Sequence, residues 1–411
     1  AMKTITILNS MKSGYFMLVV CATLLLGATA CSNEEFGMEV PEAEKVWTKQ
    51  ELIELALSRM TPTSDGSGTL AMMTTEQQTV YIKGYTKEDI EISFNSDTVI
   101  QVLGNTYFSY DHTFSNGDSY VIALAGSFDA LEELDVRRND IDFLFVSDNT
   151  QLKKLDCGSN KLAEITWDNC PNLRWIDAAY NDFSSIDVSH FPNLDTLWLE
   201  ANQLTNLDVT NNPNLELLWL NSNPITNIDL TNNTALKDLS LKGLSSLQTL
   251  NNRPLCDTSF AIFPQLEELC IAYTPFSSLD LSRNPLLIGL SMFGTDITEL
   301  NLSNLQIEYL YASYSQLTNI ICTRNSLEHA HFFQIEDTPF ENNRMNLLLF
   351  AGNLPDRSTK SKGYLYTTSP YINNVRAIVN AKNWEVISLN AQTMQYLPYA
   401  ERNRRMHHLL Q

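Results

Sequence analysis

The chain has 411 residues and a formal net charge of −21, from 48 acidic and 27 basic side chains. This length exceeds what one ordinary hydrophobic core holds and predicts a chain of several parts. The negative charge disfavours nucleic acid as a partner, because a polyphosphate would be repelled, and otherwise favours solubility.

Residues 1–30 are predicted to form a secretory signal peptide. Lys3 and Lys12 precede an uncharged apolar stretch at 15–27, and the small residues at 28–30 follow it. A basic start, a short apolar core and small residues before a cleavage point are typical of secretion. The apolar stretch is shorter than the ~20 residues that a membrane-spanning helix needs.

The next stretch, residues 31–45, is acidic and polar and is predicted to be a tether. Cys31 directly follows the small residues and resembles the lipidated cysteine of bacterial lipoproteins. The acidic pair Glu34 and Glu35 is similar to a surface-export signal of Gram-negative lipoproteins. The resemblance implies lipidation of Cys31 and anchoring in the outer membrane at the cell surface. The alternative is ordinary secretion with Cys31 as a free thiol.

Residues 46–126 are predicted to form a short N-terminal helix and a β-rich cap. Thr48 and Glu51 make a capping box at the start of the helix. The stretch 61–75, rich in Thr, Ser and Gly, is interpreted as a loop. Apolar residues then alternate with a period of two, which predicts strands near 80–82, 90–94, 99–103, 107–114 and 120–124. The alternative to a cap is a separate ligand-binding β-domain.

Residues 127–335 repeat one pattern, with successive copies 21 residues apart beginning at Leu131, Leu152, Leu173, Leu194 and Leu215. The pattern L-x-x-L-x-L-x-x-N-x-L is the leucine-rich repeat. It predicts an α/β-type leucine-rich-repeat solenoid with a parallel sheet on the concave face and a mostly irregular convex side. The ninth position carries a ladder of amides that we expect to bond backbone groups of neighbouring turns: Asn139, Asn160, Asn181, Asn202 and Asn223.

The repeat breaks once. The copy at Leu236 has Leu244 in place of the ladder Asn, and the next copy begins only at Leu266. Residues 244–265 are therefore predicted to be irregular, with a loss of sheet regularity between Leu236 and Leu266. Copies then resume at Leu287, Ile307 and Leu327, with Thr274, Thr295 and Ser315 on the ladder.

Residues 336–411 are predicted to be an α/β C-terminal cap and a basic tail. Helices are expected over 345–350 and after Pro370, and strands over 364–366 and 384–387. The tail carries Arg402, Arg404, Arg405, His407 and His408 and is interpreted as a frayed end.

The repeats are similar to the 21-residue leucine-rich repeats of internalin-type bacterial surface proteins. The segments Leu207 to Pro213 and Leu155 to Asn160 carry this likeness, which covers about half of the chain. The resemblance implies display at the cell surface and recognition of a partner on the concave face. It implies no catalytic residues.

Positions three and five of each copy point away from the core, because side chains alternate along a strand. These positions gather aromatic residues, which mark a binding surface when they are exposed together. A protein partner for adhesion or recognition is the first hypothesis, and a glycan that stacks on the tryptophans is the alternative. A further possibility is that the cap or the inserted loop buries them. The predicted ligand-binding residues are Trp175, Tyr180, Trp198, Leu217, Trp219, Tyr309 and Tyr311.

Asp135, Asp156 and Asp177 occupy position five of three successive copies. A solvated acidic rim, neutralised by Arg137 and Lys154, is the favoured interpretation, and a calcium site is the alternative.

No enzymatic activity and no cofactor are predicted. The best nucleophile–base candidates, Cys270 and His331, lie three coils apart, roughly 14 Å at strand spacing, whereas proton transfer needs hydrogen-bond contact. Cysteine spacing indicates no zinc site, and the sequence leaves open whether disulfides form among Cys157, Cys170, Cys256, Cys270 and Cys322.

Overall fold

The computed structural model describes residues 67–76, 79–94, 98–114, 120–127, 129–256 and 259–388. The predicted signal peptide, Cys31, the tether, the helix expected after Thr48 and the basic tail lie outside these residues. The chain divides into two compact units, residues 1–183 (unit 1) and 184–411 (unit 2), and each is described by itself.

Unit 1 joins antiparallel strands to the first repeats. One sheet has the order β4-β3-β6-β1-β8, and a second contains the consecutive neighbours β5, β2, β7, β9 and β10. The bounds are β1 Ser67–Thr75, β2 Thr79–Thr86, β3 Ile90–Phe94, β4 Thr98–Val102, β5 Thr106–Thr113, β6 Tyr120–Ser127, β7 Leu131–Asp135, β8 Ile141–Phe145, β9 Lys154–Asp156 and β10 Trp175–Asp177. The first repeat strand, β7, pairs antiparallel with β2 and parallel with β9, so both of its edges are hydrogen-bonded.

Strand β1 corrects the expectation of a loop up to residue 75. It pairs with β6 on one edge and β8 on the other, and Ala71 and Met73 are fully buried. Its polar composition hides this in the sequence, because both edges are satisfied by segments distant in the chain.

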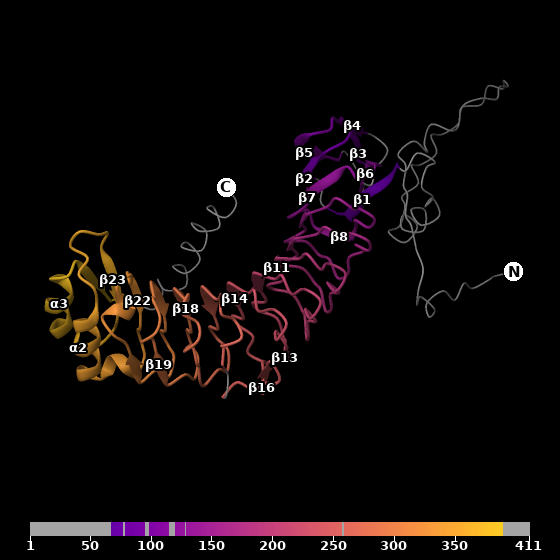
Figure 1. Ribbon diagram of the computed structural model, residues 1–411. Helices are drawn as coiled ribbons and strands as arrows, with labels where there is room; N and C mark the ends of the chain where they lie inside the picture. The colour runs from indigo at the N-terminus through magenta and orange to yellow at the C-terminus, as the bar shows by residue number, and fades with distance from the viewer. Residues whose placement is uncertain are drawn as a thin grey trace, which may run out of the picture. The chain divides into compact units, whose positions relative to one another are not determined.

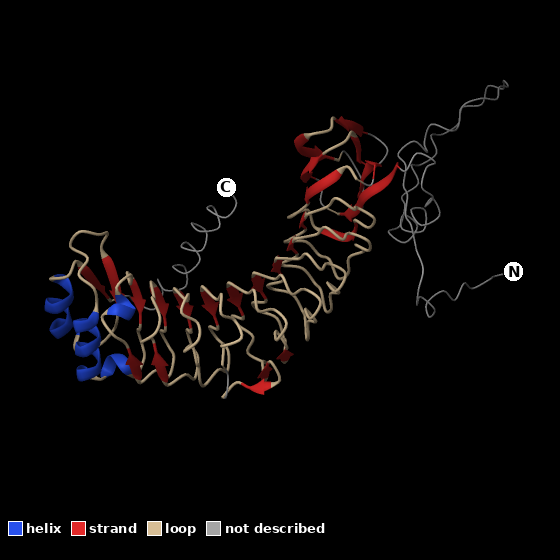
Figure 2. Cartoon of the chain, in the orientation of Figure 1, coloured by secondary structure: helices blue, strands red, loops and turns tan. Residues whose placement is uncertain are grey.

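Unit 2 is a stack of coils, each contributing one short parallel strand to a common sheet, with loops and turns making most of the remainder (Figures 1 and 2). Helices α2 and α3 follow the last coils. The sheet strands in order are β11 Thr196–Trp198, β12 Leu217–Trp219, β14 Asp238–Ser240, β17 Glu268–Cys270, β18 Gly289–Ser291, β20 Tyr309–Tyr311, β22 Phe332–Gln334, β23 Gly363–Tyr366 and β24 Trp384–Ile387. The other elements are β13 Asn227–Ile228, β15 Thr249–Leu250, β16 Arg253–Pro254, β19 Glu299–Asn301, β21 Asn319–Ile321, η2 Asn325–Leu327, η3 Phe340–Asn342, α2 Arg344–Asn353 and α3 Ile372–Asn380.

The apolar repeat positions form the core, as the pattern predicts. In the copy that begins at Leu215, this first residue is fully buried, and so are Leu218, Leu220 and Ile225. The ladder amides are buried too and bridge successive coils. Asn223 Nδ2, for example, donates to the carbonyl of Leu199 at 2.8 Å and to that of Leu220 at 2.9 Å. Stacking the coils therefore satisfies backbone groups that the short strands leave unpaired.

The Thr and Ser residues on the ladder make fewer hydrogen bonds between coils than the asparagines do. Thr295 Oγ1 donates to Met292 O at 2.9 Å and Ser315 Oγ to Ala312 O at 2.6 Å, both within their own coil. The hydroxyls therefore substitute only in part for the asparagines, which also bond the neighbouring coil.

The inserted stretch at 244–265 does not disturb the sheet, so the predicted loss of regularity between Leu236 and Leu266 is wrong. Strands β14 and β17 pair in register, with Leu239 opposite Leu269. The extra residues instead form β15 and β16, which extend the small sheet begun by β13. The backbone bond from Leu241 N to Cys270 O at 2.8 Å keeps the two coils stacked without a ladder amide.

The register of the last repeat also needs correction. Phe332 and Gln334 lie opposite Tyr309 and Tyr311 in β20. The sheet positions are therefore three residues later than in a copy that begins at Leu327, because the 3₁₀ turn η2 lengthens this coil. Consequently His329 and His331 lie before the strand.

Beyond the last repeat, the predicted helix–strand–helix–strand order is observed in α2, β23, α3 and β24. Phe333 of β22 packs against Phe350 of α2 and Trp384 of β24, with ring centroids 4.9 and 5.9 Å apart. In the described part of the chain, every helix is too short or too polar to cross a bilayer.

Candidate functional site: the sheet face of the repeats

The central aromatic pair of unit 2 is Trp198 and Trp219, which neighbouring parallel strands place side by side. Their ring centroids are 5.2 Å apart and the planes differ by 14°, so the indoles stack. Trp219 Nε1 also donates to Asp238 Oδ1 on the next strand at 3.0 Å. The two tryptophans therefore form one ordered pair on the sheet.

Their exposure differs from the prediction. Trp198 and its neighbour Leu217 are half-buried, whereas Trp219 is only 7% exposed. Stacking on one side and the bond to Asp238 on the other hold the Trp219 indole along the sheet. Trp198 is therefore the more accessible member of the pair.

A second aromatic group lies further along the same sheet. Tyr311, Phe332 and Tyr366 form a cluster, with Tyr309 packed against it. Neighbouring rings lie 4.9 to 5.7 Å apart. Tyr309 is half-buried, but Tyr311 is buried at 6% exposure, contrary to the expectation that it is exposed. Phe332 and Tyr366 were missed because they fall outside the 21-residue register.

The strands between the two aromatic groups carry small side chains at position five, while Asp238 and Glu268 occupy position three of β14 and β17. Position five is occupied there by Ser240, Cys270 and Ser291, and position three of β18 is Gly289. A Cβ at Gly289 would overlap both the carboxylate of Glu268 and the phenol of Tyr309, so glycine is what lets these groups approach. Along position five, the side chains of unit 2 are thus aromatic at Trp198 and Trp219, small on the next three strands and aromatic again at Tyr311.

Unit 1 holds the remaining predicted ligand residues. Lys154 Nζ lies 4.5 Å from the centre of the Trp175 ring, a cation–π contact that covers part of a half-buried indole. Tyr180 is 48% exposed and has a φ of 57°, in the left-handed region.

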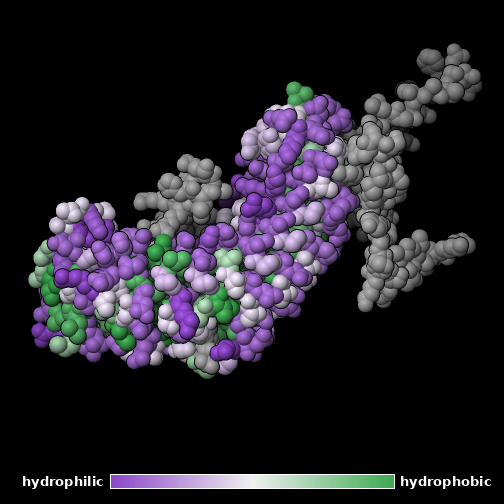
Figure 3. Space-filling view, viewed as in Figure 1, coloured by the Kyte–Doolittle hydropathy of each residue, from purple (hydrophilic) through white to green (hydrophobic). Residues whose placement is uncertain are grey.

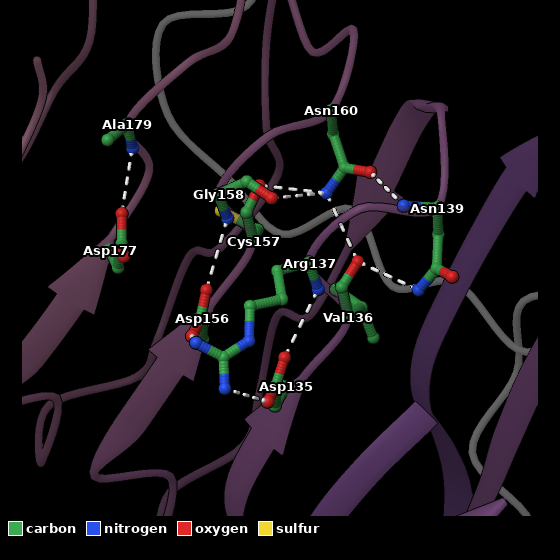
Figure 4. Close-up of polar contacts among 10 residues, drawn as sticks. All are labelled: Asp135, Val136, Arg137, Asn139, Asp156, Cys157, Gly158, Asn160, Asp177 and Ala179. Atoms are coloured by element: carbon green, nitrogen blue, oxygen red, sulfur yellow. Dashed lines mark hydrogen bonds and ion pairs between the residues drawn. The ribbon is translucent and has the colours of Figure 1, made fainter. Parts of the chain in front are cut away.

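Figure 4 shows the aspartate column of unit 1. Asp135 and Asp156 both pair with Arg137, at 2.9 and 3.2 Å. Asp156 Oδ1 also accepts a bond from Gly158 N at 3.3 Å, and Asp177 Oδ1 accepts one from Ala179 N at 3.0 Å. These carboxylates therefore shape their own turns.

Asp156 differs from the solvated rim that the sequence predicts, because it is only 2% exposed. Burial, reinforced by the charge of Asp135, raises its pKa to about 6 even though Arg137 acts in the opposite direction. Among the described residues, no group of three or more His, Cys, Asp or Glu side chains is arranged to hold a metal ion, so the calcium alternative has no support there.

Five cysteines lie among the described residues, and the structure has each as a free thiol: Cys157, Cys170, Cys256, Cys270 and Cys322. Burial raises the pKa of Cys157 well above its ordinary value and that of Cys170 to about 12, so neither is a ready nucleophile. Cys270 on β17 and His331, just before β22, remain three strands apart.

Comparison with known proteins gives likenesses of fold. No family model matches the sequence, and no curated protein matches it. Among solved structures, the functional domain of InlJ from Listeria monocytogenes is 22% identical, with a TM-score of 0.40, over 55% of this chain and 57% of that domain. A leucine-rich-repeat protein of Leptospira interrogans is 18% identical, with a TM-score of 0.32, over 61% of this chain and 83% of that one.

YopM from Yersinia enterocolitica is 24% identical, with a TM-score of 0.28, over 46% of this chain and 47% of YopM. The chain thus spans little more than half of the InlJ domain and less than half of YopM. The fold itself is clear from the chain's own repeat, its parallel strands and its amide ladder. The chain folds as a leucine-rich-repeat solenoid.

Proposed function

We propose that this protein is a non-enzymatic binding module that recognises a protein partner through the sheet face of its repeats. The observation that carries the proposal is the face of unit 2, where the stacked Trp198 and Trp219 and the cluster around Tyr311 flank a floor of small residues. Solenoids use such extended faces for binding. Aromatic anchors beside a shallow surface of small side chains are the usual hot spots of protein interfaces.

Within this face, Trp198 is the anchor and Trp219 its support. Trp198 is half-buried and has one indole face stacked on Trp219, which is itself fixed by Asp238. A pre-ordered indole loses little entropy when a partner covers it. Tyr309 and Leu217 are the next most accessible of the predicted contacts.

Charge favours a partner that is basic where it meets this face. The chain has a net charge of −21, and Asp238 and Glu268 stand at position three between the aromatic groups. Opposite charge steers association and suppresses unsuitable partners.

In the view of Figure 3, apolar side chains gather in patches over unit 2, whereas the visible face of unit 1 is mainly hydrophilic.

Surface display completes the proposal. The cysteine after the predicted signal peptide would carry a lipid, which would hold the protein at the outer membrane of a Gram-negative cell, with the tether between anchor and repeats. The repeats' resemblance to internalin-type surface proteins supports this placement.

Site-specific photo-crosslinking tests the binding face. A benzophenone side chain replaces Tyr309 or Tyr364 on the sheet and, as a control, Ile321, which is 44% exposed on β21 of the separate β19–β21 sheet. We expect one discrete protein adduct from the two sheet positions, absent from the control and lost when Trp198→Ala is added. Equal adducts from all three positions, or adducts indifferent to Trp198, would overturn the proposal.

A further inference from the structure

Unit 2 has another aromatic surface, on the turn that follows each sheet strand. Tyr273, Phe293 and Tyr314 come from three successive coils, and each neighbouring pair of ring centroids is 5.1 Å apart. Tyr273 is 52% exposed and Tyr314 39%, and Phe293 between them is half-buried. We call these three residues the turn-edge aromatic cluster. The leucine pattern does not reveal it, because it occupies positions seven and eight of the repeat.

The backbone holds the two tyrosines in place at some cost. Tyr273 and Tyr314 have φ of 56° and 57°, in the left-handed region where side chains other than glycine cost about 1 kcal/mol or more. The same repeat position has a positive φ in other coils too, both at Gly243 and Gly294 and at residues with side chains such as Ala201 and Ser222. The left-handed backbone is therefore a feature of the repeat, and in these two coils it carries a solvent-exposed tyrosine.

Gly294 makes room for the cluster. A Cβ at this residue would lie 2.9 Å from Cδ1 of Tyr273, so only glycine allows the Tyr273 ring to lie over the next coil. Backbone hydrogen bonds keep the three coils in register. Tyr273 N donates to Phe293 O at 2.7 Å, and Gly294 N donates to Ser313 O at 3.0 Å. The rings are pre-ordered before any ligand arrives.

One end of the cluster offers hydrogen-bond acceptors. Burial raises the pKa of the Tyr314 phenol, and the nearby carboxylate of Asp337 raises it further. The exposed carboxylate of Asp337 accepts hydrogen bonds and donates none, and the phenol oxygen of Tyr314 can accept a bond as well. A suitable ligand must therefore bring its own donors.

We propose that the turn-edge aromatic cluster binds a short neutral glycan, whose apolar ring faces stack on the aromatic rings while its hydroxyls donate to Asp337 and Tyr314. A proline-rich peptide fits less well, because proline has no N–H to donate. An anionic glycan would meet Asp337 and the net charge of −21. A protein interface needs ~20–30 residues on each side, whereas this cluster spans three coils, roughly 10 Å.

This site is distinct from the sheet face, so either proposal can fail without the other. The test is retention of the full chain on an array of neutral and acidic glycans. The variants are Tyr273→Ala, Tyr314→Ala and the control Tyr81→Ala, which removes a tyrosine of 51% exposure outside both the cluster and the sheet face of unit 2. We expect retention on neutral glycans, weakened about fivefold or more by each cluster variant and unchanged by the control.

Tyr273→Gly separates binding from folding. It removes the ring and relieves the left-handed backbone, so the melting temperature should stay the same or rise while glycan retention falls. Absence of neutral-glycan retention would overturn the proposal, as would a preference for acidic glycans or displacement by a proline-rich peptide. A large loss of stability in Tyr273→Gly would instead make the cluster a structural element.

Discussion

Asn160 offers the sharpest test of what holds the coils together. Its Oδ1 accepts from the backbone N–H of Asn139 at 3.0 Å, and its Nδ2 donates to the carbonyls of Val136 and Cys157, at 3.1 and 2.8 Å (Figure 4). The same Oδ1 also accepts from the backbone N–H of Ile141 at 3.1 Å. In Asn160→Ala both carbonyls keep another amide donor, Asn139 Nδ2 and Asn181 Nδ2 respectively. The two N–H groups belong to fully buried residues and lose this acceptor.

Each buried group left without a partner costs about 1–3 kcal/mol, so Asn160→Ala should lower the free energy of unfolding by about 4 kcal/mol. Thr295→Ala is the matched control, because the Thr295 hydroxyl makes one bond within its own coil, and it should cost about 1 kcal/mol. Urea unfolding, with hydrogen exchange at the amides of Asn139 and Ile141, measures both. Equal decreases in the free energy of unfolding of the two variants would refute the role assigned to the Asn160 hydrogen bonds. Undiminished exchange protection of the Asn139 and Ile141 amides would refute it as well.

Three further predictions concern the aromatic face, the aspartate column and the anchor. Trp219→Ala should cost about 3–5 kcal/mol of stability, as for a buried indole, and Trp198→Ala about half as much; equal losses in urea unfolding would contradict the burial seen here. Asp156 has a folded pKa of about 6 against an ordinary 3.8, so its unfolded form ionises first as the pH rises. Relative to Asp156→Asn, the wild type should therefore lose about 3 kcal/mol of stability between pH 4 and about pH 6, with little further change above; parallel pH profiles would refute this. Cys31→Ser should release the protein from the membrane fraction, and unchanged retention would rule out the lipid anchor.

The solenoid was predictable because its cause is local and repeated. Each coil buries the same four apolar positions, and the copies from Leu131 to Leu215 present the same amide. A 21-residue period with Asn at position nine therefore predicts both the strand and its bonds to the neighbouring coil. The stacking of Trp198 on Trp219 follows from the same register.

Tertiary pairing decided what composition could not. Residues 67–75 form a strand only because β6 and β8 satisfy both of its edges, and the residues inserted after Leu244 leave the sheet intact because their own β15–β16 pairing lies elsewhere. The three-residue shift at Phe332 depends on a 3₁₀ turn that no apolar period encodes.

The candidate site was predictable as a set of positions but not as a surface. The repeat placed Trp219 and Tyr311 on the sheet face, but their burial depends on neighbours on other strands, Asp238 for one and Phe332 for the other. The turn-edge tyrosines lie outside the leucine pattern altogether. Only the folded chain brings Tyr273 over Gly294, because a left-handed backbone at one repeat position aligns side chains from coils about 20 residues apart.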